Sequence, residues 1–186
     1  SKKVSSAITV NQSVSIQGSA VVDFGNSSVS GSAGLSMVSG TLLISKLSGT
    51  TSPELDATAT GANYQLSGGT IEFYGSNATG TNQRIRAKDG QNRTIQYYNL
   101  VLNANGANNS GNILAAGPLM IQNSFQLNSP TVLDLGAGDI ISGNGSFTMM
   151  NGSTLKFAHN NGLALDGQIQ MNGPRNLLTG ALSTKL

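Results

Sequence analysis

Basic side chains gather in one short segment of the sequence. Four of the ten lysines and arginines lie within it, at Arg84, Arg86, Lys88 and Arg93. Guanidinium groups fork onto carboxylates and sulfates, so this cluster predicts contact with an anionic surface polysaccharide or with a partner chain. The same four charges also suit a solvated loop, and the sequence leaves both interpretations open.

Residue types that commonly carry catalysis are scarce. His159 is the single histidine, in a segment with the composition of a corner between strands, and cysteine is absent. Neither a G-x-S-x-G elbow nor a G-x-G-x-x-G phosphate loop occurs. We therefore predict no catalytic residue, no cofactor and no metal site.

A shift of 22 residues organises the stretch from Pro118 to Thr179. It superimposes three rows in which apolar and polar residues alternate, namely Phe125-Gln126-Leu127, Phe147-Thr148-Met149 and Ile169-Gln170-Met171. A second series at the same interval consists of Leu133, Leu155 and Leu177. A chain that returns to the same side-chain type at a fixed interval returns to the same place, one layer further along.

The local alternation decides which kind of solenoid this is. Alternating apolar and polar residues indicate strands with one buried face, and no window sustains the spacing of an amphipathic helix. We predict an all-β fold, a parallel right-handed β-helix with about 22 residues and three short strands per coil. Two inward columns are then expected, one of Phe125, Phe147 and Ile169 and another of Leu133, Leu155 and Leu177.

The acidic residues do not follow this interval. They are Asp23, Glu54, Asp56, Glu72, Asp89, Asp134, Asp139 and Asp166. A β-helical enzyme that cleaves polysaccharides needs carboxylates on adjacent coils, as an acid and base pair or around Ca²⁺. A 22-residue coil instead places Asp134 over Lys156, which predicts a cross-coil ion pair or solvated corners.

A longer repeat of about 111 residues suggests how the whole chain is organised. Matching pairs at that separation include Ile8 and Leu119, Val14 and Phe125, and Asp23 and Asp134. We predict one rod over residues 1–186, with 4–114 as a complete long unit and 115–186 as a partial second unit. The polar, glycine-punctuated segment 75–93 is expected to be an irregular lateral loop.

Composition narrows the function classes further. Only 10% of residues are charged and the formal net charge is +2, which is too small a margin to predict nucleic-acid binding. No apolar run approaches the ~20 residues of a membrane span. The 24 glycines suit a fold made of short strands and tight corners.

The motifs of Gly145–Asn161, and those of Gly68–Ser76 and Tyr97–Gly106, resemble the long repeats of Bacteroidetes surface and secreted proteins. Matching positions are Phe147-Thr148, Gly152, Thr154-Leu155-Lys156, Tyr74-Gly75 and Asn99-Leu100-Val101-Leu102. The resemblance implies a β-solenoid array in an exported adhesin or stalk, often delivered by type IX secretion. Since Leu177–Leu186 lacks the features of that family's C-terminal sorting domain, we expect a fragment, a processed product or a protomer.

These observations together predict a non-catalytic, extracellular structural or adhesive solenoid, as a segment or protomer of a bacterial cell-surface adhesin, stalk or filament. The expected partners are cell-surface polysaccharide or other surface proteins, with end-to-end self-association as a further expectation. The alternative is a β-helix that binds or cleaves polysaccharide. Ice binding is disfavoured because the outward residues Gln126, Thr148 and Gln170 form no threonine ladder.

Overall fold

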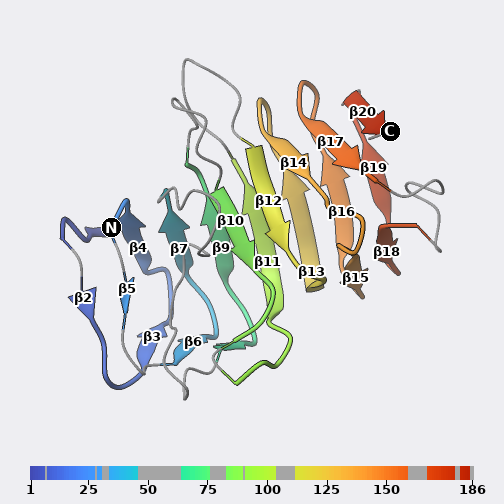
Figure 1. The fold of residues 1–186 in the computed structure, drawn as a ribbon. Coiled ribbons are helices and arrows are strands. Elements are labelled where there is room, and N and C mark those ends of the chain that lie inside the picture. Colours follow the sequence, from blue (N-terminus) through green and yellow to red (C-terminus); the bar gives the residue numbers. More distant parts are fainter. Residues whose placement is uncertain are drawn as a thin grey trace.

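The computed structural model shows a solenoid of parallel β-strands, which confirms the predicted fold class. It describes residues 1–6, 8–27, 29–30, 34–45, 64–75, 83–89, 91–103, 112–158, 167–178 and 181–184. Within these ranges the strands follow one another from β1 to β20 along one axis (Figure 1). No helix long and apolar enough to cross a bilayer occurs in this part of the chain.

The described strands lie on three faces of the solenoid. The first face contains β3 (Val14–Ile16), β6 (Leu35–Met37), β8 (Tyr64–Leu66), the starts of β11 (Gln96–Leu102) and β13 (Leu119–Leu127), β15 (Ile141–Gly143) and β18 (Ile169–Met171). The second contains β1 (Lys2–Lys3), β4 (Val21–Gly25), β7 (Thr41–Ile44), β9 (Thr70–Phe73), the ends of β11 and β13, β16 (Ser146–Met149) and β19 (Arg175–Leu177). The third contains β2 (Ile8–Thr9), β5 (Val29–Ser30), β10 (Gln83–Arg86), β12 (Asn112–Ala116), β14 (Val132–Asp134), β17 (Thr154–Phe157) and β20 (Ala181–Thr184).

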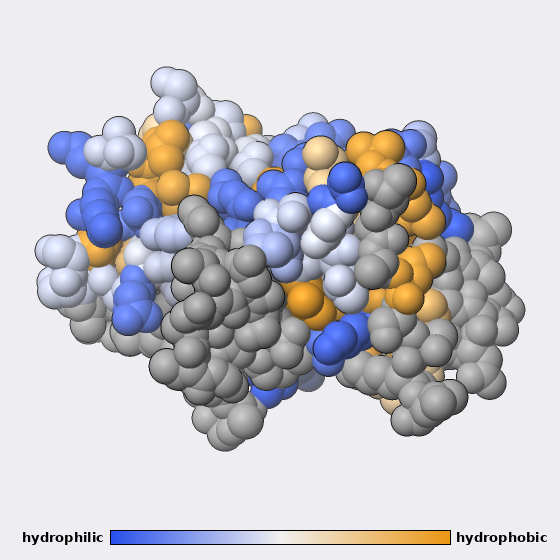
Figure 2. Space-filling view, turned by 90° about the horizontal axis from the view of Figure 1, so that it is seen from above, coloured by the Kyte–Doolittle hydropathy of each residue, from blue (hydrophilic) through white to orange (hydrophobic). Residues whose placement is uncertain are grey.

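Polar side chains connect the layers on the outside. The Asn99 side-chain amide donates to the Gly69 carbonyl oxygen at 2.9 Å. Its Oδ1 accepts from Asn123 Nδ2 and from Ser124 Oγ, both at 2.7 Å. These bonds connect β11 to β13 and to the residue before β9, and hydrophilic residues are visible beside the grey atoms in the view from above (Figure 2).

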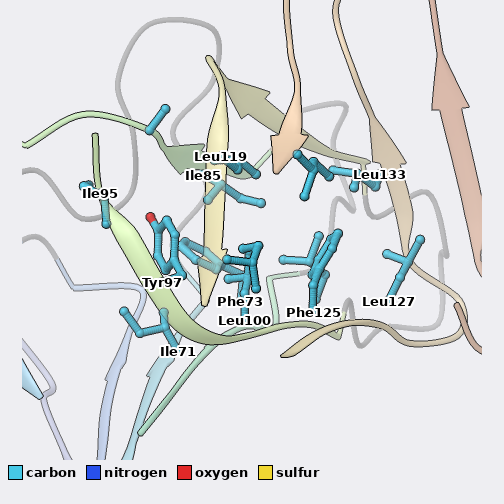
Figure 3. Packing of buried hydrophobic residues seen from close by; sticks show 14 of the residues in the cluster. Ile71, Phe73, Ile85, Ile95, Tyr97, Leu100, Leu119, Phe125, Leu127 and Leu133 are labelled. Carbon is cyan, nitrogen blue, oxygen red and sulfur yellow. The ribbon is translucent and has the colours of Figure 1, made fainter. Parts of the chain in front are cut away.

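Apolar side chains fill the interior in columns that follow the strand register. On the second face one column consists of Val22, Leu42, Ile71, Leu100, Phe125 and Phe147. The rings of Phe125 and Phe147 stack with centroids 5.2 Å apart and planes at 30°. On the third face Leu133 pairs with Leu155, and Figure 3 shows how side chains from different strands converge on this core. Both pairings were expected from the 22-residue shift.

The position predicted for the third residue of each column is wrong. Ile169 pairs with Ile141 instead of Phe147, and Leu177 pairs with Met149 instead of Leu155. Twelve residues (157–168) separate Lys156 from Ile169, whereas six (135–140) separate Asp134 from Ile141. The last coil is therefore six residues longer on this path. Because six is an even number, the extra residues leave the inward and outward alternation unchanged. The row Ile169-Gln170-Met171 therefore still matched the earlier rows in the sequence.

Coil length varies because the corners vary. Paired residues on the second face are 20 apart at Val22 and Leu42, 29 apart at Ile71 and Leu100, and 22 apart at Phe125 and Phe147. The residues related by the 111-residue shift lie on different faces, since Val14 is in β3 and Phe125 is in the end of β13.

Part of the segment expected to be an irregular loop is a regular strand. β10 lies within 75–93 and pairs in parallel with β12. Its Gln83 and Ile85 are buried, while Arg84 and Arg86 point outward. The outward arginines make this segment polar in composition, so the alternation with the buried Gln83 and Ile85 was not recognised as a strand. Residues 76–82 and 90 lie outside the described ranges.

Candidate functional site

A hollow of about 380 Å³ opens on the first face between β8 and β11. Strands β3, β6 and β8 form a sheet of their own, and the ladder of the first face resumes with β11 and β13. We call the hollow between these two sheets the slot. It is lined by Tyr64, Gln65, Leu66, Ser67, Asp89, Arg93, Thr94 and Gln96.

A short antiparallel turn forms one wall of the slot. Lys88 and Thr94 make an isolated antiparallel bridge, and the backbone N–H of Ile95 donates to the Ala87 carbonyl oxygen at 2.9 Å. Asn92 adopts a positive φ of 61° at the tip, a conformation that asparagine tolerates better than most residues. Ala87 and Ile95 are buried in the core, so the turn is anchored at both ends.

Asp89 and Arg93 form the charged centre of this wall. Asp89 Oδ2 accepts from Arg93 Nε at 2.7 Å, and its Oδ1 accepts from the backbone N–H groups of Gln91 and Arg93, each at 2.9 Å. The Asp89 side chain is 5% exposed and that of Arg93 is 49% exposed. The carboxylate thus accepts three hydrogen bonds, and among the described residues the terminal nitrogens of Arg93 make no hydrogen bond.

Asp89 makes the stability of this wall depend on pH. Burial raises the pKa of Asp89, but hydrogen bonds from Arg93 and Gln91 and the charge of Arg93 outweigh it, so the pKa lies below its ordinary value of 3.8. A lowered pKa contributes stability that is fully present above the ordinary value and is lost as the pH falls through the folded-state pKa. We expect Asp89→Asn to lower the free energy of unfolding by about 1–3 kcal/mol at pH 7. The difference from the unmodified protein should shrink below pH ~4, measured by urea unfolding at several pH values; a constant difference would contradict this assignment.

Tyr97 fixes the start of β11 from the inside. Its buried hydroxyl donates to the Arg86 carbonyl oxygen at 2.6 Å, and burial raises the pKa of this phenol well above its usual range. The ring lies between Ile71 and Ile95 in Figure 3. This contact connects β10 to β11 across the base of the turn, which holds the wall of the slot in place.

A second hollow of about 240 Å³ lies on the same face. It is lined by Ser13, Gly34, Leu35, Ser36 and Gln65. Gln65 therefore borders both hollows. Its outward position continues a register of Ser15 and Ser36 on β3 and β6. The first face thus carries two hollows that share Gln65.

The structure places the four basic residues that the sequence grouped partly on the third face and partly at the slot. Arg84 and Arg86 lie on the outer surface of β10 on the third face, and Arg86 Nε donates to the Lys88 carbonyl oxygen at 2.6 Å. Lys88 Nζ donates to Thr94 Oγ1 at 2.8 Å at the rim of the slot. Of the four, Arg93 alone lines the slot. Sequence reasoning missed Asp89, whose signal was its spacing of four residues from Arg93.

The other candidate acidic residues have local partners. Asp134 lies in register with Lys156, as the 22-residue shift predicted. The carboxylate of Asp139 accepts from the backbone N–H groups of Gly136 at 2.8 Å and Gly117 at 3.1 Å, which holds a corner. Over the described ranges no group of three or more His, Cys, Asp or Glu side chains is placed to hold a metal ion. His159, Glu54, Asp56 and Asp166 lie outside those ranges.

Comparison with known proteins identifies no relative of this chain. No family model, no curated protein and no solved structure matches the chain. The β-solenoid arrangement that the Bacteroidetes resemblance implies is present, while membership of that group of repeats stays a prediction.

Proposed function

We propose that this protein is a non-catalytic structural and adhesive rod, a segment or protomer of an exported bacterial surface adhesin, stalk or filament. The observation that carries the proposal is the parallel ladder of the second face, which runs β1-β4-β7-β9-β11-β13 and continues through β16 and β19. A stack of this kind grows in one direction by adding layers, which suits spacing and display. The resemblance to Bacteroidetes repeats supports an extracellular location and a type IX secretion route.

If these 186 residues act as a complete subunit, the last described layer favours end-to-end association of its copies. Leu177 and Leu182 continue the inward columns of Met149 and Leu155, yet they are 43% and 47% exposed, and Leu178 is 50% exposed. Apolar atoms gather toward this end in Figure 2. Across the described ranges β18, β19 and β20 are each paired on one side. Another solenoid layer would cover the leucines and pair with these edges.

This proposal predicts that two lysines at the end will block association. The double variant Leu177→Lys, Leu182→Lys should sediment as monomer at concentrations where the unmodified chain forms larger species, because each lysine would place a charge in the apolar contact. The control is Val38→Lys, since Val38 is 53% exposed at a corner away from that end. Analytical ultracentrifugation measures the outcome. An unmodified chain that stays monomeric throughout, or an equal effect of both variants, would contradict end-to-end assembly.

Polysaccharide recognition is the second candidate function, and the slot favours it. Its lining combines amides, hydroxyls and a guanidinium, which can hydrogen-bond sugar hydroxyl groups, with an aromatic residue that offers apolar surface. Cleavage is less well supported, because Asp89 is held ionised by its donors and a general acid needs a raised pKa. Incubation with acidic and neutral polysaccharides, with and without Ca²⁺, tests this directly. Sugar release that Asp134→Asn or Asp139→Asn abolishes would overturn the non-catalytic proposal.

A further inference from the structure

We propose that the slot binds the carboxylate of a uronic acid residue within an extended acidic polysaccharide, with Arg93 as the group that contacts the carboxylate. This inference rests on the polysaccharide recognition proposed above and names the class of sugar. It is carried by the Asp89–Arg93 pair, by the lining of the slot and by the hollow that adjoins it.

Arg93 is already oriented for such a contact. Asp89 holds its Nε at 2.7 Å, and the backbone N–H of Arg93 donates to the same carboxylate at 2.9 Å. A guanidinium fixed through Nε still presents two terminal nitrogens, which match the two oxygens of a carboxylate. Little side-chain freedom is then lost on binding, and pre-organisation of this kind strengthens affinity.

The charged groups around the slot favour a ligand that carries one negative charge. Asp89 offsets the charge of Arg93, and Lys88 lies at the rim through its bond to Thr94 Oγ1. The sum over these three groups is one positive charge. A uronic acid carries one carboxylate per sugar ring, which balances that sum.

The rest of the lining fits a sugar ring rather than a small inorganic anion. Gln65 and Gln96 supply amides, Ser67 and Thr94 supply hydroxyl groups, and Leu66 and Tyr64 supply apolar surface. The volume of about 380 Å³ lies within the ~300–1,000 Å³ of ligand pockets. Gln65 also borders the second hollow, so a neighbouring sugar of the same polymer can occupy it.

The test is a titration of the whole chain with oligogalacturonate, oligomannuronate and oligoguluronate, each beside its carboxyl-reduced counterpart. We expect at least one uronate to bind, to shift the Arg93 Nε–H signal in a ¹H–¹⁵N spectrum, and to bind about tenfold more tightly than its reduced form. Arg93→Gln should weaken uronate binding by a similar factor. Its matched control is Arg84→Gln, which removes the same charge from the third face and should leave affinity within about twofold.

Each result decides the inference. Uronate binding that Arg93→Gln leaves unchanged, or that Arg84→Gln weakens equally, would overturn it in favour of another surface or of diffuse attraction between charges. Binding to reduced and acidic forms alike would also overturn it, while polysaccharide recognition would stand. If none of these oligosaccharides binds, the inference fails, and neutral polysaccharides then test recognition separately. The backbone N–H donors of residues 91 and 93 to Asp89 remain when the Arg93 side chain is replaced, so the turn should be kept, and the amide spectrum of the variant verifies this.

Discussion

Replacing Gly143 by alanine is expected to lower the free energy of unfolding by about 3 kcal/mol or more. Gly143 has a φ of +121°, a conformation that residues with a Cβ rarely adopt. A Cβ added there would lie 2.0 Å from the carbonyl oxygen of Ile121 in the layer below. That oxygen is part of the backbone and accepts from the N–H of Gly145 at 3.2 Å, so it cannot move aside without breaking the corner.

Gly138→Ala is the matched control. Gly138 is exposed in the preceding corner, has no positive φ in the left-handed region, and a Cβ added there would meet nothing within 4 Å. Its replacement should change stability by less than about 0.5 kcal/mol. Denaturant unfolding followed by circular dichroism measures both variants. Equal effects, or a loss below about 1 kcal/mol for Gly143→Ala, would show that this corner relaxes easily.

The corner at Gly143 belongs to a series of close backbone contacts between layers. A Cβ on Gly145 would lie 2.8 Å from the backbone of Asn123, and one on Gly173 would lie 2.5 Å from the Gly145 carbonyl oxygen. Small residues at this corner let the first and second faces meet tightly in successive coils. The glycine content of the sequence therefore reflects layer spacing as well as turn conformation.

The fold could be predicted from sequence because strand alternation encodes which side chains face inward. Phe125, Phe147, Leu133 and Leu155 occupy the columns that the 22-residue shift predicted. Alternation does not encode how many residues a corner contains. The longer corner before β18 therefore moved Ile169 out of its expected column while leaving its inward orientation intact.

The same limit explains why the slot was not predicted. Arg93 was identified because it belongs to a cluster of basic residues in the sequence. The two segments that line the slot, Tyr64 to Ser67 and Asp89 to Gln96, lie side by side only because of the lengths of the corners between them. The pairing of Asp89 with Arg93 could have been inferred from their spacing. Its consequence, a guanidinium held at the edge of a hollow, depends on the break in the first-face ladder between β8 and β11.

Phe147→Ala should produce the other large loss of stability, about 3–5 kcal/mol. The Phe147 side chain is fully buried and stacks on Phe125 at 5.2 Å. Truncation removes its apolar area from the core, leaves a cavity, and deletes an aromatic pair that contributes about 0.5–1.5 kcal/mol beyond burial. Thr148→Ala is the control, because Thr148 lies on the same strand at a partly exposed outward position and should change stability by less than about 0.5 kcal/mol.

The strands that Phe147→Ala destabilises distinguish a solenoid from a globular core. Each layer of a solenoid contacts only its neighbours, so a cavity at β16 should weaken the C-terminal coils more than the N-terminal ones. In hydrogen exchange, Phe147→Ala should expose the amides of β15 to β19 first, while β4 and β7 keep most of their protection. Equal loss of protection in β4 and β19 would mean that the chain unfolds as a single unit. The stack would then be too cooperative to behave as a series of separable layers.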